Sequence, residues 1–110
     1  KKVLKIPTGN LDSWFCKPED LRKIVSKKAD KCDIAVIEGV MGYYDGMGFT
    51  QRASAYEIAD ITSTPVILII NCKGMSSSLE AVLSGFANMK QNSHIKGVIF
   101  NRLSEKLYCQ

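Results

Sequence analysis

The sequence contains no long hydrophobic run. A membrane-spanning helix needs roughly 20 consecutive apolar residues, and the longest apolar run here, residues 66–70, has the length of a buried strand. The charged start at residues 1–5 is not followed by the hydrophobic region of a signal peptide. These absences argue against insertion in a membrane and against export, so we expect a cytoplasmic protein.

Histidines and paired cysteines are also scarce. His94 is the single histidine. The four cysteines are Cys16, Cys32, Cys72 and Cys109, and no two of them have the C-x-x-C spacing of a zinc site or a redox pair. The spacing is not that of a small secreted disulfide scaffold either. We expect reduced, structural cysteines.

The phosphate-binding motif G-x-x-x-x-G-K-S/T does not occur in the 110 residues. Positive charge is modest, with a net charge of +4, and much of it lies at residues 17–31 around one predicted helix. A nucleic-acid-binding surface has a denser basic patch interleaved with exposed aromatic residues. We therefore expect a solvated helix face and no nucleic-acid partner, with attraction to a polyanionic small molecule left open.

Hydrophobic periodicity predicts helices that alternate with strands. The predicted helices cover roughly residues 18–29, 55–62 and 78–91, and the predicted strands cover residues 33–38, 66–71 and 96–101. Such alternation is typical of an α/β domain with a parallel sheet and crossover helices. Strands this apolar need cover on both faces, so we expect the complete domain to contain more strands than these.

An open parallel sheet binds ligands at the carboxyl ends of its strands. Glu38 ends the first predicted strand, and Asp45 follows in a glycine-rich loop, residues 39–48. A carboxylate at the tip of an apolar strand is typical of a Mg²⁺ site beside nucleotide phosphates, and glycines let the loop fold back toward that site. The alternative is that Asp45 and Gly46 form only a turn.

Residues 38–46, Glu-Gly-Val-Met-Gly-Tyr-Tyr-Asp-Gly, resemble the signature of the cobyrinic and hydrogenobyrinic acid a,c-diamide synthases. Residues 10–14, Asn-Leu-Asp-Ser-Trp, are similar to the family's Asn-Leu-Asp-Pro-Trp segment, with Ser13 in place of the proline. Segments that also match in the right order are residues 54–59, 65–71, 73–75 and 97–102. The similarity covers nearly the whole chain, and the signature at residues 38–46 is its specific part.

The resemblance implies that residues 1–110 are an internal fragment of the N-terminal ATP-binding domain, a partial P-loop NTPase-like domain similar to dethiobiotin synthetase. The family's P-loop strand would lie upstream and a glutamine amidotransferase domain downstream. In this family, ATP phosphorylates the a- and c-carboxylates of the corrinoid cobyrinic acid during cobalamin biosynthesis, and ammonia from glutamine displaces the phosphate. ATP and Mg²⁺ are the expected cofactors, a homodimer is compatible with the resemblance, and the isolated fragment is expected to be inactive.

The resemblance also implies roles for individual residues. Glu38 and Asp45 would be catalytic, with Glu38 holding Mg²⁺ and Asp45 supporting the same metal or the phosphorylated intermediate. Asn101 and Gly39 would lie at the nucleotide. The residues expected on the corrinoid side are Asn10, Asp12 and Tyr44.

Two other classes of function stay open. Within the synthetases, the alternatives are nickel-sirohydrochlorin a,c-diamide synthase, cobyric acid synthase and a dethiobiotin-synthetase-like ligase. The last prefers Glu-Gly-Ala-Gly-Gly where this chain has residues 38–42. A different class is a non-catalytic remnant or a partitioning-ATPase-like module that binds a partner protein.

Overall fold

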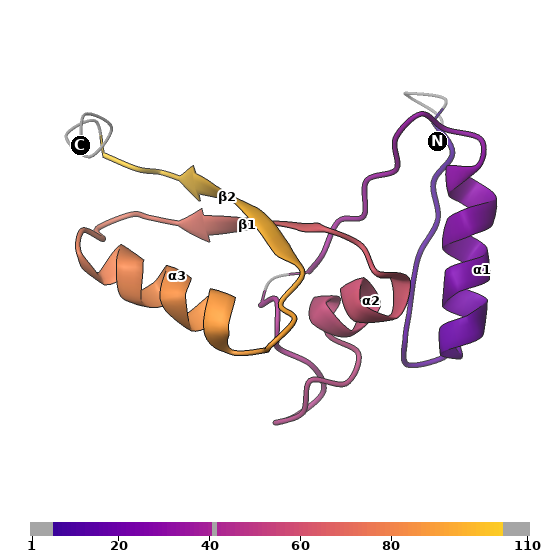
Figure 1. The fold of residues 1–110 in the computed structure, drawn as a ribbon, viewed down its shortest axis with the longest axis horizontal. Coiled ribbons are helices and arrows are strands. Elements are labelled where there is room, and N and C mark those ends of the chain that lie inside the picture. Colours follow the sequence, from indigo (N-terminus) through magenta and orange to yellow (C-terminus); the bar gives the residue numbers. More distant parts are fainter. Residues whose placement is uncertain (1–5, 41, 105–110) are drawn as a thin grey trace. The chain divides into compact units, whose positions relative to one another are not determined.

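Figure 1 shows the protein as a computed structural model, which describes residues 6–40 and 42–104. The chain divides into two compact units, Lys1–Thr64 and Pro65–Gln110. The first unit contains helices α1 (Pro18–Ala29) and α2 (Ala55–Thr62), and the second contains strand β1 (Val66–Asn71), helix α3 (Ser78–Asn88) and strand β2 (Ile95–Asn101). No helix in the described part of the chain is long and apolar enough to cross a membrane.

Helix α1 begins and ends where the sequence predicts. Pro18 occupies the first turn, where its missing N–H removes no intrahelical hydrogen bond. The acidic residues in this turn interact favourably with the positive end of the helix dipole. Leu21 is fully buried and is the core residue of this helix. Arg22 donates a hydrogen bond of 3.3 Å from Nη1 to the carbonyl oxygen of Ile61, which ties α1 to α2.

Helix α2 is defined by a side-chain cap. The Ser54 hydroxyl is completely buried and accepts a hydrogen bond of 3.1 Å from the backbone N–H of Glu57. The helix ends at Ser63, which takes the left-handed conformation, with φ of 53°, that commonly terminates helices. The predicted bounds of this helix are confirmed.

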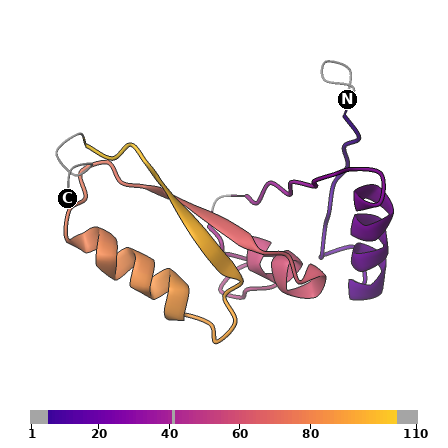
Figure 2. The same ribbon diagram turned by 45° about the horizontal axis from the view of Figure 1, so that its top comes forward.

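Strands β1 and β2 pair in parallel, with Ile69 opposite Ile99 and Asn71 opposite Asn101. Figures 1 and 2 both show α3 alongside this strand pair, as expected for a helix that connects two parallel strands. Leu68 and Ile70 are buried, so one face of the pair is covered. The half-buried side of α3 consists of the residues that recur at helical spacing, Leu79, Val82, Leu83 and Phe86.

The opposite face of the strand pair is apolar and open. Ile67, Ile69 and Ile99 are each more than half exposed, at 56%, 64% and 52%. Alternation along β1 therefore separates a covered face from an uncovered one. The prediction of a parallel sheet with a crossover helix is confirmed for these two strands.

The predicted strand at residues 33–38 is wrong for this structure. The segment has no regular secondary structure, and Ile34 and Val36 are 79% and 86% exposed instead of buried. A parallel strand exists only when a neighbour accepts and donates its backbone hydrogen bonds. The first unit has no strand among its described residues to supply that neighbour.

The C-terminal predictions hold in part. Helix α3 ends at Asn88, a turn earlier than predicted, and β2 begins one residue earlier, at Ile95.

Candidate functional site

The second half of the signature folds as a tight turn. The backbone N–H of Asp45 donates to the carbonyl oxygen of Gly42 at 3.0 Å. Gly42 has a φ of +83°, and a side chain at this position would overlap the Asp45 carboxylate. Only glycine satisfies both requirements at low cost, so the turn fixes the direction from which Asp45 leaves the backbone. Asp45 itself is exposed.

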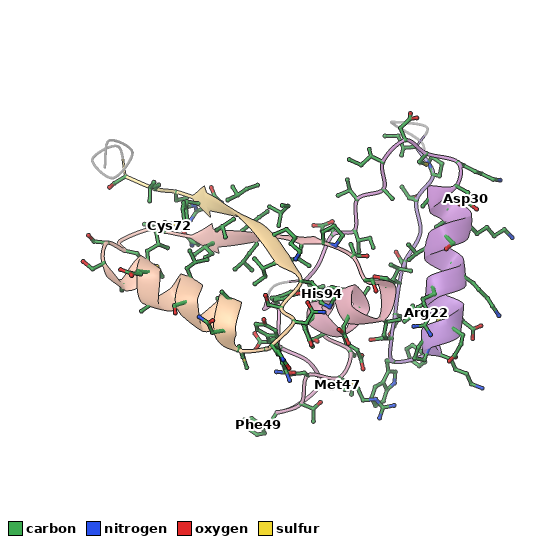
Figure 3. All side chains as sticks on the ribbon, viewed as in Figure 1. Arg22, Asp30, Met47, Phe49, Cys72 and His94 are labelled. Atoms are coloured by element: carbon green, nitrogen blue, oxygen red, sulfur yellow. The ribbon has the colours of Figure 1, made fainter. Side chains whose placement is uncertain are left out.

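A second turn follows and carries an exposed tip. The Gly46 N–H donates to the carbonyl oxygen of Thr50 at 3.1 Å, and the Met47 N–H donates to the carbonyl oxygen of Arg52 at 2.9 Å. A side chain at Gly46 would collide with the backbone of residues 50–52. Phe49 lies at the tip, fully exposed, and Figure 3 shows it pointing away from the ribbon. We call residues 42–53 the turn loop.

Three tyrosines anchor the turn loop to α2. The ring centroids of Tyr43 and Tyr44 lie 4.7 Å apart, and those of Tyr44 and Tyr56 lie 5.2 Å apart. The Tyr56 N–H also donates to the carbonyl oxygen of Tyr43 at 2.9 Å. Tyr43 and Tyr44 are buried, whereas the next residue, Asp45, is exposed. The aromatic cluster therefore holds one end of the loop while leaving the carboxylate accessible.

The cluster predicts a loss of stability in alkaline solution. Burial, together with the negative charges that Tyr44, Tyr56 and Asp60 can carry, raises the pKa of Tyr43 to about 12. Because this value lies above the unfolded value of about 10, the folded state keeps a proton that the unfolded state loses. The contribution of Tyr43 to stability is therefore complete below about pH 10 and disappears as the pH rises to about 12.

Urea denaturation at several pH values across this range measures the effect. We expect the free energy of unfolding to fall with rising pH, and to fall less steeply in Tyr43→Phe, which has no phenolic proton to lose. Equal slopes in the two proteins would contradict the assignment to Tyr43.

The residues predicted at the nucleotide and metal lie in both units. Glu38 is exposed in the irregular segment before the turn loop. Gly39 lies against the start of α2, where an added Cβ would approach the Ala55 Cβ to 3.1 Å. Asn101 ends β2, and its carbonyl oxygen accepts a hydrogen bond of 2.8 Å from the Cys72 N–H.

Glu38 and Asp45 are both exposed. In the described ranges no three His, Cys, Asp or Glu side chains are grouped closely enough to hold a metal ion. The predicted metal-facing roles of Glu38 and Asp45 stay predictions. Cys16, Cys32 and Cys72 are free thiols, as predicted, and Cys109 lies outside the described residues.

The residues predicted on the corrinoid side lie in different surroundings. Asn10 and Asp12 are exposed, and Asp12 Oδ1 accepts a hydrogen bond of 2.8 Å from the Trp14 N–H. This contact closes a local turn that presents the following side chains. Tyr44, in contrast, is buried in the aromatic cluster.

A carboxylate that the sequence analysis did not single out joins these segments. Glu57 Oε2 accepts hydrogen bonds from the Ser13 hydroxyl at 2.6 Å and from the Ala53 N–H at 2.7 Å. The pattern Ser54-x-x-Glu57 is the signature of a capping box and would have drawn attention to Glu57. In a capping box the glutamate accepts a hydrogen bond from the N–H of the cap residue. Here Glu57 accepts instead from Ala53, the residue before the cap, and from Ser13 in a distant segment.

Comparison with known proteins places the chain in a family. Residues 17–107 match the family model described as an AAA domain. The chain belongs to this family. No solved structure gives a significant match.

Curated relatives share almost the full length of the chain. It is 38% identical over 109 residues to the cobyrinate a,c-diamide synthase of Sulfurisphaera tokodaii, an alignment that covers 96% of this chain and 24% of that protein. It is 39% identical to the synthases of the same name from Saccharolobus solfataricus, over 96% of the chain and 26% of that protein, and from Priestia megaterium, over 94% and 23%. The resemblance predicted from the signature is thereby confirmed. The chain spans about a quarter of the length of these relatives.

Proposed function

We propose that this chain is part of an ATP-dependent amidoligase that converts the a- and c-carboxylates of a cobyrinic acid-type corrinoid to amides. The observation that carries the proposal is the identity of 38–39% over nearly the whole chain to proteins named cobyrinate a,c-diamide synthase. The AAA-domain match supports nucleotide use. The synthase would contain the rest of a dethiobiotin-synthetase-like domain and a glutamine amidotransferase domain outside these 110 residues.

The chemistry follows from the poor reactivity of a carboxylate as an acyl donor. In the proposed reaction a carboxylate oxygen of the corrinoid attacks the γ-phosphorus of ATP, and ADP leaves. Ammonia, released from glutamine, then attacks the carbonyl carbon of the acyl phosphate, and phosphate leaves as the amide forms. Each amide therefore consumes one ATP and one ammonia.

The donor set of the signature suits a hard cation. Glu38 and Asp45 are exposed carboxylates, and carboxylate oxygens are the ligands that Mg²⁺ prefers in proteins. We propose Glu38 as the metal-holding residue and Asp45 as its support. When bound, Mg²⁺ would offset the negative charge of the phosphates.

The other predicted residues keep their places in the proposal. Gly39 and Asn101 would lie at the nucleotide, with Gly39 leaving room where a side chain would crowd Ala55. Asn10 and Asp12 would face the corrinoid from the exposed turn before α1. Tyr44 would act from within the aromatic cluster, by fixing the loop beside the substrate.

The test uses the full-length protein that contains this chain. Incubation with ATP, Mg²⁺, glutamine and cobyrinic acid is expected to give the monoamide and then the diamide, detected by mass spectrometry, with ADP formed in step. Nickel-sirohydrochlorin replaces cobyrinic acid in a parallel reaction. Amidation of that substrate alone would assign the protein to the other diamide synthase, and no amidation of either would favour a binding module. The 110-residue chain alone is expected to be inactive in the same assay.

A further inference from the structure

An exposed arginine lies on the face of the single tryptophan of this chain. The guanidinium carbon of Arg52 is 5.0 Å from the centroid of the Trp14 ring, within the range of a cation–π contact. Trp14 is 43% exposed and Arg52 is exposed. No carboxylate pairs with Arg52 among residues 6–40 and 42–104. The N–H donors at the edge of the guanidinium are therefore available to an anion.

One oxygen of the Glu57 carboxylate joins the two segments that carry Trp14 and Arg52. Glu57 Oε2 accepts from the hydroxyl of Ser13, the residue before Trp14, and from the N–H of Ala53, the residue after Arg52. The two segments are far apart in sequence and are joined at this atom. Because charge-assisted hydrogen bonds are short and directional, this bridge fixes the spacing between the two backbones that present the pair.

The backbone beside Arg52 is held in an unusual conformation. Ala53 has a φ of 62°, in the left-handed region that is costly for a residue with a Cβ. The Arg52 carbonyl oxygen is fixed at the same time by the Met47 N–H. Strained residues persist where surrounding contacts determine them, and they gather at ligand sites. Here the Ala53 N–H donates a hydrogen bond to the Glu57 carboxylate.

The two segments that carry Trp14 and Arg52 also carry exposed apolar side chains. Phe15, Met47 and Phe49, from the same two segments, are 82%, 47% and fully exposed. Aromatic and thioether side chains bind apolar ring edges, and a planar guanidinium binds a carboxylate through two parallel hydrogen bonds. A tetrapyrrole with carboxylate side chains combines both features.

We propose that Trp14 and Arg52 form a substrate contact that determines specificity for a carboxylate-bearing tetrapyrrole. The guanidinium binds a peripheral carboxylate other than the one that reacts, the indole packs on the macrocycle, and Glu57 is a positioning residue that sets the pair. This inference rests on the proposed function for the identity of the ligand. The residues expected at the substrate from the sequence are Asn10, Asp12 and Tyr44. The inference adds Trp14 and Arg52, to which the sequence assigned no role.

Binding to the full-length protein tests the contact without requiring turnover. Equilibrium dialysis measures the affinity for cobyrinic acid and for its fully methyl-esterified form. Arg52→Gln is expected to weaken binding of the acid by about 10- to 100-fold, the usual effect of losing a hydrogen bond between charged groups. Binding of the ester and of ATP is expected to be unchanged. Lys23→Gln, which removes an exposed positive charge from α1, is the matched control and is expected to bind the acid like the wild type.

Two further variants separate the parts of the contact. Trp14→Leu is expected to weaken binding of the acid and the ester alike, because the indole contacts the macrocycle. Glu57→Ala is expected to weaken binding of the acid with unchanged ATP affinity, and Glu57→Gln, whose amide oxygen can still accept both hydrogen bonds, is expected to restore it. Circular dichroism of each variant establishes that it is folded.

The outcomes distinguish this inference from the proposed function. Wild-type protein that binds the corrinoid through Arg52 but does not amidate it would overturn the function and support the contact. Amidation with unchanged acid binding in Arg52→Gln would support the function and overturn the contact. Wild-type protein that does not bind the corrinoid would overturn both.

Discussion

Under the proposed function, Glu38→Gln in the full-length protein that contains this chain is expected to lower kcat for corrinoid amidation by roughly 1000-fold. The substitution keeps the shape of the side chain and removes the charge that would hold Mg²⁺ at the phosphates. A metal ion contributes several kcal/mol of charge stabilisation in a phosphoryl-transfer transition state, and every 1.36 kcal/mol corresponds to a factor of ten. The carboxylate is exposed, so the loss is expected in activity and not in stability.

Steady-state kinetics at increasing Mg²⁺ concentration measure this loss. The concentration of Mg²⁺ that gives half-maximal rate is expected to rise in Glu38→Gln. Glu19→Gln removes an exposed acid from the first turn of α1 and serves as the control, with kcat near that of the wild type. If Glu38→Gln and Glu19→Gln had the same kcat and Mg²⁺ dependence, the metal-holding role of Glu38 would be refuted.

Leu21→Ala is expected to cause a large loss of stability. Leu21 is fully buried between α1 and its neighbours in the first unit. Removing its branched end costs the transfer free energy of the lost methyl groups and leaves a cavity, together about 2–5 kcal/mol. The effect should appear as a lower midpoint of urea denaturation with little change in its slope.

Lys23→Ala provides the comparison on the same helix. Its side chain is exposed, and substitutions at such positions usually change the free energy of unfolding by less than about 0.5 kcal/mol. A Leu21→Ala protein as stable as Lys23→Ala would mean that α1 does not pack as the structure describes.

Local chemistry was enough to predict most of the elements. Pro18 with the two acids that follow it marked the start of α1, and Ser54 marked the start of α2. The β-branched run at residues 66–71 and the similar run before Asn101 were found as strands. Each of these signals depends on residues that are close together in the sequence, so it can be identified without the tertiary structure.

Family membership was also predictable from short segments. The signature at residues 38–46 is read from adjacent residues, and its second half forms a local turn closed by the hydrogen bond from the Asp45 N–H to the Gly42 carbonyl oxygen. The curated relatives then confirmed the resemblance over almost the entire chain.

Long-range contacts account for what could not be predicted. Residues 33–38 have the composition of a strand, yet composition does not supply the neighbour whose backbone groups a strand must pair with. The burial of the Tyr44 ring depends on its packing against Tyr56 in α2, which the sequence around Tyr44 does not specify.

The turn loop shows the same division most clearly. Its glycines and Asp45 can be identified from the sequence because they act on adjacent residues. The Glu57 bridge and the stacking of Arg52 on Trp14 join residues about forty positions apart. Such contacts form only after helix α2 and the segment before α1 are packed together, so the folded first unit alone determined them.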